Sequence, residues 1–162
     1  MKIYIGIDPG KSGGIAALKE DGQLDIIMPM PLAGSDVDFG FIADVLYNRY
    51  IETSPQVVCV AYVEKVGAMP KQGVTSMFNF GFVTGGVHGV LAAFAIPRYS
   101  VPPTEWKNVV LKGTTKDKDA AVEYCRMAWP ETNLLATPRS KKPHSGMADA
   151  LCIAKYAQLT HR

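Results

Sequence analysis

The amino-acid sequence predicts an α/β protein, a central mixed sheet of five strands flanked by helices. Three short apolar segments come first, and Asp21–Gly22 marks a hairpin turn between the second and the third. A continuous apolar strand follows later, of the kind that a sheet buries on both faces. Helical patterns then alternate with strands, which is typical of parallel central strands. The strands are expected at residues 1–7, 13–18, 24–28, 57–63 and 99–101, within one domain over 1–162.

The spacing of apolar residues predicts helices at residues 35–52, 74–95, 104–111, 116–128 and 147–159. Ser35 is the expected N-cap of the first helix. In the second helix, Gly81, Gly85 and Gly89 recur at every fourth residue. Each glycine costs the helix about 1 kcal/mol relative to alanine. We therefore expect this glycine stripe to pack closely against the sheet or against another helix.

Charge is distributed unevenly along the chain. Residues 1–97 carry 6 Lys and Arg against 9 Asp and Glu, whereas residues 98–162 carry 11 against 6. This pattern suits an anion-binding face with a carboxylate site elsewhere, and uneven surface charge is the alternative. The three cysteines lie in apolar stretches without metal-ligand spacing, so we expect buried free thiols. The chain begins directly with a strand, which predicts no signal peptide and a cytoplasmic protein.

Three acidic residues stand out by their positions. Asp8 closes the first strand, Glu64 closes the fourth, and Asp149 lies in the first turn of the last helix. If the two strands are parallel neighbours, Asp8 and Glu64 emerge at the same end of the sheet, where open α/β sheets place their sites. Each position also has a simpler interpretation. Asp8 suits a turn before Pro-Gly, Glu64 suits a solvent-exposed strand end, and the helix dipole favours Asp149.

Converging carboxylates would repel one another, and burying each without a partner would cost several kcal/mol. A divalent cation removes this cost, and oxygen ligands suit Mg²⁺ or Mn²⁺. Two such ions about 4 Å apart can activate a water and stabilise the leaving oxygen of a phosphodiester. His144, just ahead of Asp149, is a candidate metal ligand or general base. The alternative is a loop histidine that hydrogen-bonds to the backbone.

Three segments resemble the catalytic segments of the RuvC-type Holliday junction resolvases, which have the RNase H-like fold: IGIDPGKSGGIAAL, VAYVEKVGAMP and HSGMADALCIA. The resemblance covers nearly the whole chain, in the same order and spacing. It implies magnesium-dependent cleavage of four-way DNA junctions by a homodimer that nicks two strands symmetrically. It also implies two Mg²⁺ ions per site, replaceable by Mn²⁺. Asp8, Glu64 and Asp149 match the acidic residues of that family.

The segment VPPTEWKNVVLKGTTKDKDAAV is similar to the family's basic segment beside the junction. Lys107 matches one lysine of that segment, and Lys118 or Lys116 matches a second. The helix at 74–95 matches the helix that contributes to dimerisation. The short, compact loops are more similar to those of phage-type members than to those of the bacterial enzyme, so a bacterial cell or a phage-infected host is the expected setting.

Two positions depart from the bacterial pattern. Three residues before the last aspartate, the bacterial family has an acidic residue or a histidine, whereas this chain has Gly146. His144 stands two residues earlier, so the fourth ligand is either His144 or none. Shortly after the catalytic glutamate, the bacterial enzyme has an aromatic residue at the junction centre. This chain has Gly67 there, with Met69 nearby, so no cleavage-sequence preference carries over.

The basic half of the chain can contact DNA phosphates, which position DNA without reading its sequence. The candidates are Lys107, Lys112, Lys116, Lys118, Arg139, Lys141 and Lys142. Each of them taken singly also fits a solubility charge. Tyr99 and Trp106 can stack on bases, although the helical spacing of Trp106 favours the core.

Three alternative functions remain open from the sequence. DPGKSGG is also similar to the phosphate-binding hairpin of actin-like ATPases, but 162 residues hardly provide the two lobes of such a protein. A nuclease of the same fold could act on flaps, replication forks or RNA hybrids. A DNA-binding relative without catalysis is the third alternative, and the three intact acidic residues argue against it.

Overall fold

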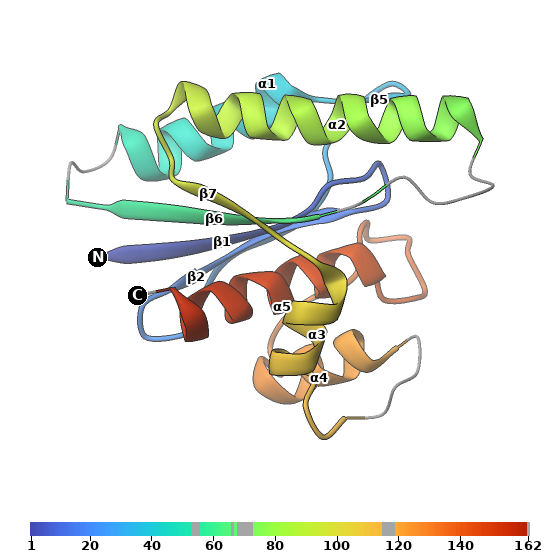
Figure 1. The fold of residues 1–162 in the computed structure, drawn as a ribbon. Coiled ribbons are helices and arrows are strands. Elements are labelled where there is room, and N and C mark those ends of the chain that lie inside the picture. The colour runs from blue at the N-terminus through green and yellow to red at the C-terminus, as the bar shows by residue number, and fades with distance from the viewer. Residues whose placement is uncertain (53–55, 66, 68–72, 115–118, 162) are drawn as a thin grey trace.

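The computed structural model describes residues 1–52, 56–65, 67, 73–114 and 119–161. It has three layers (Figure 1): two helical segments and the long helix α2 cover one face of a sheet, and three further helices cover the other face. Lys116, Lys118 and Met69 lie outside the described residues. None of the helices in the described ranges is long and apolar enough to cross a membrane.

The main sheet has five strands in the order β3-β2-β1-β6-β7. Its first three strands form an antiparallel meander, whereas β6 and β7 run parallel to β1. This mixed sheet confirms the predicted fold class. The strands are β1 (Lys2–Asp8), β2 (Gly14–Lys19), β3 (Leu24–Pro29), β6 (Val58–Glu64) and β7 (Arg98–Val101).

The side chains of β1 alternate between two cores, because successive residues of a strand point to opposite faces. Ile3, Ile5 and Ile7 are fully buried in the core under the long helix α2 (Val74–Ala93). Gly6 lies on the opposite face, against the last helix, α5 (Ser145–Thr160). Asp8 has the same parity as Gly6, so its side chain lies on the α5 face of the sheet.

The first helix is shorter than predicted. Residues 32–37 form a small hairpin of β4 (Leu32–Ala33) and β5 (Asp36–Val37), and helix α1 spans Phe39–Leu46. The predicted N-cap Ser35 is therefore wrong. Asp38 caps the helix instead, because its carboxylate accepts a hydrogen bond from the Phe41 backbone N–H at 2.9 Å. A π-helical turn, η1 (Tyr47–Ile51), continues the chain.

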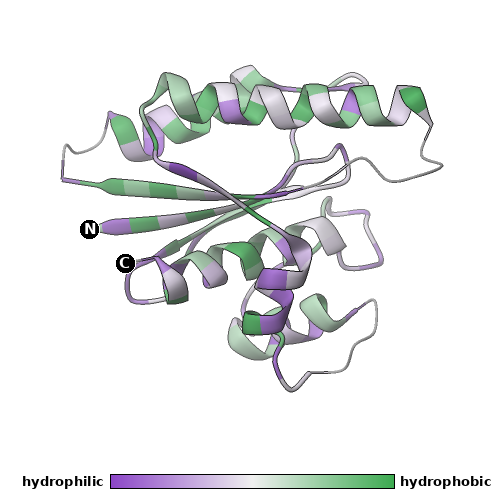
Figure 2. Ribbon diagram, in the orientation of Figure 1, coloured by the Kyte–Doolittle hydropathy of each residue, from purple (hydrophilic) through white to green (hydrophobic). Residues whose placement is uncertain are grey.

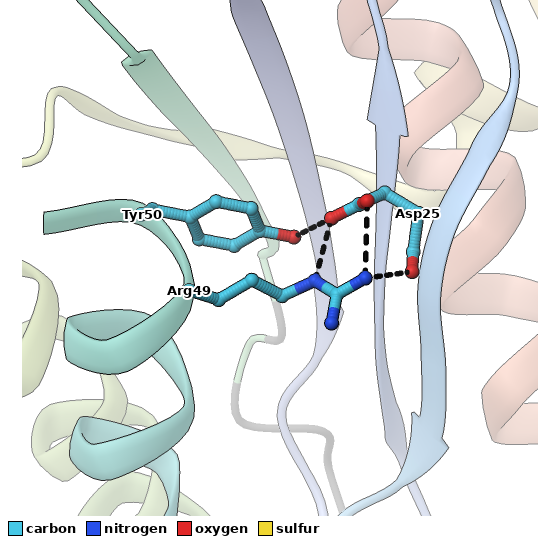
Figure 3. Close-up of polar contacts among 3 residues, drawn as sticks. All are labelled: Asp25, Arg49 and Tyr50. Carbon is cyan, nitrogen blue, oxygen red and sulfur yellow. Dashed lines mark hydrogen bonds and ion pairs between the residues drawn. The ribbon is translucent and has the colours of Figure 1, made fainter. Parts of the chain in front are cut away.

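A polar cluster joins η1 to the edge of the sheet (Figure 3). The Arg49 guanidinium donates two hydrogen bonds to the Asp25 carboxylate, through Nε at 2.8 Å and Nη2 at 3.1 Å. The Tyr50 hydroxyl donates a third, at 2.6 Å. These donors hold the pKa of Asp25 below its ordinary value, chiefly through the hydrogen bond from Arg49. The cluster lies on the α1 side of the sheet, so it supports the fold rather than the site described below.

Helix α2 packs on the sheet through Val83, Val87 and Leu91, all buried. Its glycine stripe does not take part in that contact. A Cβ placed on Gly81, Gly85 or Gly89 would meet no atom within 4 Å. The stripe therefore lies on the outward side of the helix and does not pack on the sheet. Close packing against another helix, the alternative that the sequence offered, stays a prediction.

The second helical layer comprises α3 (Pro103–Val110), α4 (Ala120–Ala128) and α5. Helix α5 begins two residues before the predicted start, because His144 caps it (see below). Cys59, Cys125 and Cys152 are free and buried, as the sequence predicts. Trp106 and the apolar side of α5 form a second core with the sheet.

Candidate active site

Helix α5 lies unusually close to the first two strands. A Cβ on Gly6 of β1 would lie 2.1 Å from the Ala150 carbonyl oxygen, and a Cβ on Gly14 of β2 would lie 2.8 Å from the Gly146 carbonyl oxygen. Only glycine permits such contact between backbones at these positions. The contact carries Asp149, the neighbour of Ala150, over the end of β1.

The strand pairing brings two more carboxylates to the same place. Ile7 of β1 pairs with Val63 of β6 in a parallel register, so Asp8 and Glu64 follow side by side at the carboxyl ends of both strands. The structure thus brings together Asp8, Glu64 and Asp149, the three acidic residues that the sequence singles out, from β1, β6 and α5. They form the acidic cluster of the candidate site.

Burial and the neighbouring negative charges make Asp8 and Asp149 hard to ionise. Burial, and after it the neighbouring charges of Glu64 and Asp149, together raise the pKa of Asp8 to about 7. The pKa of Asp149 rises to about 6, again chiefly through burial. The nearby Lys107 opposes both shifts by its positive charge. A cluster with such pKa values favours either protons or a cation beside it.

Glu64 has a hydrogen-bond partner that sequence reasoning missed. The indole Nε1 of Trp106 donates a hydrogen bond to Oε1 of Glu64 at 2.9 Å. Trp106 is fully buried, which confirms that it belongs to the core. Its neighbour Lys107 is exposed, and the Lys107 ammonium lies 5.1 Å from the centre of the Trp106 ring. Trp106 stands next to Lys107 in the matched basic segment, and this neighbourhood is the sequence feature that could have pointed to a role for Trp106 at the site.

The acidic cluster fits a divalent cation by its chemistry. It offers oxygen ligands, which Mg²⁺ and Mn²⁺ prefer, and its members repel one another without a positive charge between them. Among the residues that the structure describes, no three acidic, histidine or cysteine side chains are placed to hold one metal ion together. The three carboxylates therefore lie near one another, but their present positions do not form a complete coordination shell for one ion.

His144 is the N-cap of α5. Its Nδ1 accepts a hydrogen bond from the Met147 backbone N–H at 3.2 Å, and its own backbone N–H donates to the Leu134 carbonyl at 2.7 Å. A neutral imidazole that accepts at Nδ1 carries its proton on Nε2, which then has no lone pair for a metal ion. This geometry favours the hydrogen-bonded loop histidine, and a catalytic role for His144 stays a prediction.

Position 146, where the bacterial pattern has an acidic residue or a histidine, has no room for a side chain. A Cβ on Gly146 would lie 2.3 Å from the Ser12 carbonyl oxygen and 2.6 Å from the Gly13 Cα. The departure from the bacterial pattern therefore has a structural reason: the first turn of α5 rests directly on the turn between β1 and β2.

Of the predicted phosphate-binding residues, Lys107 places its positive charge near Asp8 and Asp149. The described candidates for phosphate contacts are all exposed: Lys107, Lys112, Arg139, Lys141 and Lys142. Arg139, Lys141 and Lys142 lie in the loop that leads into α5. Of the two aromatic candidates for stacking, Tyr99 is 46% exposed and Trp106 is not exposed at all. Gly67, after Glu64, is exposed with open space around it.

Comparison with solved structures identifies the architecture. The structure of Thermus thermophilus RuvC in complex with Holliday junction substrate matches with a TM-score of 0.67 and 18% sequence identity, over 95% of this chain and 91% of that chain. A second structure of Thermus thermophilus RuvC matches with a TM-score of 0.59 and 19% identity, over 95% and 92% of the two chains. The chain has the RuvC fold.

The match to RuvC confirms the RNase H-like fold that the sequence motifs imply. No protein-family model and no curated protein sequence matches the chain. With identities below one fifth, the three-dimensional match supports the fold, and the acidic cluster carries the argument about chemistry.

Proposed function

We propose that this chain is a metal-dependent endonuclease that resolves four-way (Holliday) DNA junctions by symmetric phosphodiester cleavage. The observation that carries the proposal is the acidic cluster: Asp8, Glu64 and Asp149 meet at the carboxyl ends of β1 and β6 on a RuvC fold. The RuvC structure with the higher TM-score was solved with Holliday junction substrate. The proposal extends that substrate to this chain.

Asp8, Glu64 and Asp149 are the proposed ligands of two Mg²⁺ ions, which Mn²⁺ could replace. When bound, such ions would lower the pKa of an attacking water and stabilise the leaving oxygen of the phosphodiester. The chain itself contributes a rigid frame, because the glycine contacts of Gly6 and Gly146 fix α5 on the sheet. The Lys107 ammonium, beside Asp8 and Asp149, would stabilise negative charge on the phosphate.

The exposed basic residues of the second half of the chain would hold the DNA. Arg139, Lys141 and Lys142 project from the loop before α5, and Lys112 follows α3. Lys116 and Lys118 extend this set from the sequence alone. Such phosphate contacts give affinity that weakens steeply with salt and does not depend on base sequence. These contacts would therefore position the DNA without reading its base sequence.

Helix α2 supports a homodimer. It contains no Asp, Glu, Lys or Arg over its twenty residues, and Figure 2 shows mostly green or pale turns along it. Phe78 is 72% exposed and Phe82 59% exposed, beside the open glycine stripe. Exposed aromatic side chains on an uncharged helix favour a partner on its outer side as well. A second copy across a two-fold axis would cover this face and supply the second site for symmetric nicking.

The experiment that tests the proposal compares DNA structures. Labelled four-way, three-way, flap and linear DNA of the same arm sequences are incubated with the protein, with and without Mg²⁺. We expect Mg²⁺-dependent cuts at two symmetric positions of the four-way junction and little cleavage of linear DNA. Preferred cleavage of flaps or forks would instead identify a nuclease for other branched DNA, and binding without cleavage would identify a non-catalytic relative.

A further inference from the structure

We propose that Trp106 is a positioning residue of the active site: its indole N–H holds one carboxylate oxygen of Glu64 and leaves the other free to bind a cation. This inference rests on the proposed function for the role of Glu64, but not for the contact itself. The contact is the 2.9 Å hydrogen bond from Trp106 Nε1 to Glu64 Oε1.

The indole suits this task because of what it lacks. It has one N–H donor and no acceptor, so it can bind Glu64 only by donating. The ring is fully buried between α3 and the sheet, so packing fixes the direction of the N–H. Glu64 closes a strand and is only partly buried. Without the indole bond, its side chain could rotate between several orientations in water.

The two residues that flank Trp106 in helix α3 also interact with neighbouring parts of the structure. Glu105, one residue before Trp106, accepts a hydrogen bond from the Tyr156 hydroxyl of α5. Lys107, one residue after it, places its positive charge near Asp8 and Asp149. Three successive residues of α3 therefore contact the helix of Asp149, the strand of Glu64 and the acidic cluster. The Trp106 bond is the one that acts on a proposed ligand.

The chain contains a matched control. It has two tryptophans, and the other, Trp129, also uses its indole N–H, which donates to the Gly22 carbonyl at 3.0 Å. Gly22 lies in the turn between β2 and β3, away from the acidic cluster. Trp129 is partly buried and Trp106 fully buried, so the two match in the indole hydrogen bond rather than in burial. A loss that comes only from removing an indole hydrogen bond should therefore occur for both tryptophans, whereas a loss at the active site should occur for Trp106 alone.

The first test observes the contact directly, without DNA. Protein labelled with ¹⁵N should give two indole N–H signals in a proton–nitrogen correlation spectrum, assigned with Trp106→Phe and Trp129→Phe. We expect Glu64→Ala and added Mg²⁺ each to shift the Trp106 signal and to leave the Trp129 signal in place. A Trp106 signal that responds to neither change would overturn the proposal, even if the protein cleaves junctions.

The second test measures the consequence for cation use. Trp106→Phe should raise the Mg²⁺ concentration for half-maximal junction cleavage by about tenfold, the scale of a lost hydrogen bond to a charged group, while junction affinity is unchanged. Trp129→Phe should keep the wild-type Mg²⁺ dependence. If Trp106→Phe fails to fold, a benzothienyl analogue of tryptophan at position 106 replaces the N–H with sulfur and nearly keeps the shape of the ring. Wild-type Mg²⁺ dependence in the folded variant would show that Trp106 serves the core alone.

A wild-type protein that cleaves no junction would contradict the proposed function and leave the spectroscopic test intact. In that case the Trp106 and Trp129 signals still decide whether the indole holds Glu64 beside a cation site. The failure of the inference and the failure of the proposed function are thus distinguishable.

Discussion

Gly146 of α5 rests against Gly13 in the turn that follows β1: a Cβ on Gly146 would lie only 2.6 Å from the Gly13 Cα. Non-bonded carbon atoms do not approach so closely, so position 146 accepts only glycine while α5 keeps its place. This contact explains why the chain has no acidic residue three positions before Asp149, although the bacterial pattern has one.

We expect Gly146→Ala to destabilise the protein by about 3 kcal/mol, at the upper end of overpacking effects. Gly146→Asp, which restores the acidic residue of the bacterial pattern, should destabilise it at least as much and should not raise the cleavage rate. Urea unfolding measures the free energies. Gly67→Ala is the control, because open space surrounds Gly67, and it should change stability by less than about 0.5 kcal/mol. A Gly146→Asp variant with wild-type stability would contradict this packing.

The acidic cluster should make the metal-free protein less stable as the pH rises. The pKa of Asp8 is about 7 in the folded protein and 3.8 ordinarily. A carboxyl whose pKa rises on folding favours the folded state while it is protonated. Its contribution is fully present below the ordinary pKa and is lost as the pH rises through the folded one. Asp149, with a pKa of about 6, acts in the same direction.

Asp8→Asn removes this titration, so the variant should gain stability over the wild type between about pH 4 and about pH 8, by about 2 kcal/mol at the upper end. Chemical unfolding of the chelator-treated proteins at each pH measures this difference in the free energy of unfolding. His88 and His161, whose pKa values burial lowers, affect both proteins equally and cancel. Millimolar Mg²⁺ should narrow the gap by stabilising the wild type. Equal stability at every pH would show that Asp8 carries no such penalty.

Two variants of His144 distinguish a capping role of this residue from a catalytic role. Its Nδ1 caps α5 at the Met147 N–H, so His144→Ala should lower stability by about 1 kcal/mol. His144→Asn keeps a side-chain acceptor for the cap, and we expect it to retain both stability and a cleavage rate near that of the wild type. If the asparagine variant loses about 10²-fold in rate while junction affinity holds, the imidazole acts as a general base or a ligand, as the sequence suggests.

The outer face of α2 should hold the dimer together. Phe78→Glu places a charge on this apolar face and should convert the dimer into a monomer that still binds DNA. Sedimentation or light scattering measures the mass. The matched control is Met127→Glu, because Met127 of α4 is also an exposed apolar residue, at 69%, but lies on the opposite layer. A wild-type protein that is monomeric, free and with a junction, would contradict the proposed interface.

The sheet could be predicted from the sequence, because strand alternation and long apolar runs are strong signals. The parallel pairing of β1 with β6 then follows from the order of elements, and it places Asp8 beside Glu64. The first residue of α1 could not be predicted from the sequence. The two-residue strands of the small hairpin have no periodicity to detect, and Asp38 and Ser35 are equally good caps by residue type.

For the glycine stripe and for Trp106, the sequence pattern predicts a contact but does not identify the contact partner. A repeat of Gly81, Gly85 and Gly89 signals close approach, but not whether the approaching surface belongs to the same chain. Helical spacing correctly places Trp106 in the core, but the partner of its N–H depends on how α3 crosses the end of β6. The Nδ1 cap of His144 depends likewise on a loop conformation that residue types alone do not specify.

Junction cleavage by Asp8→Asn tests the central claim most directly. Wild-type protein in Mg²⁺ should nick a labelled four-way junction at two symmetric positions. Asp8→Asn should lose at least about 10³-fold in rate and bind the junction as tightly as the wild type, because the lysines and arginines hold the phosphates. Asp44→Asn, an exposed aspartate of α1 on the other layer, is the control and should cleave normally. Cleavage by Asp8→Asn at the wild-type rate would contradict the assignment of Asp8, Glu64 and Asp149 as the active site.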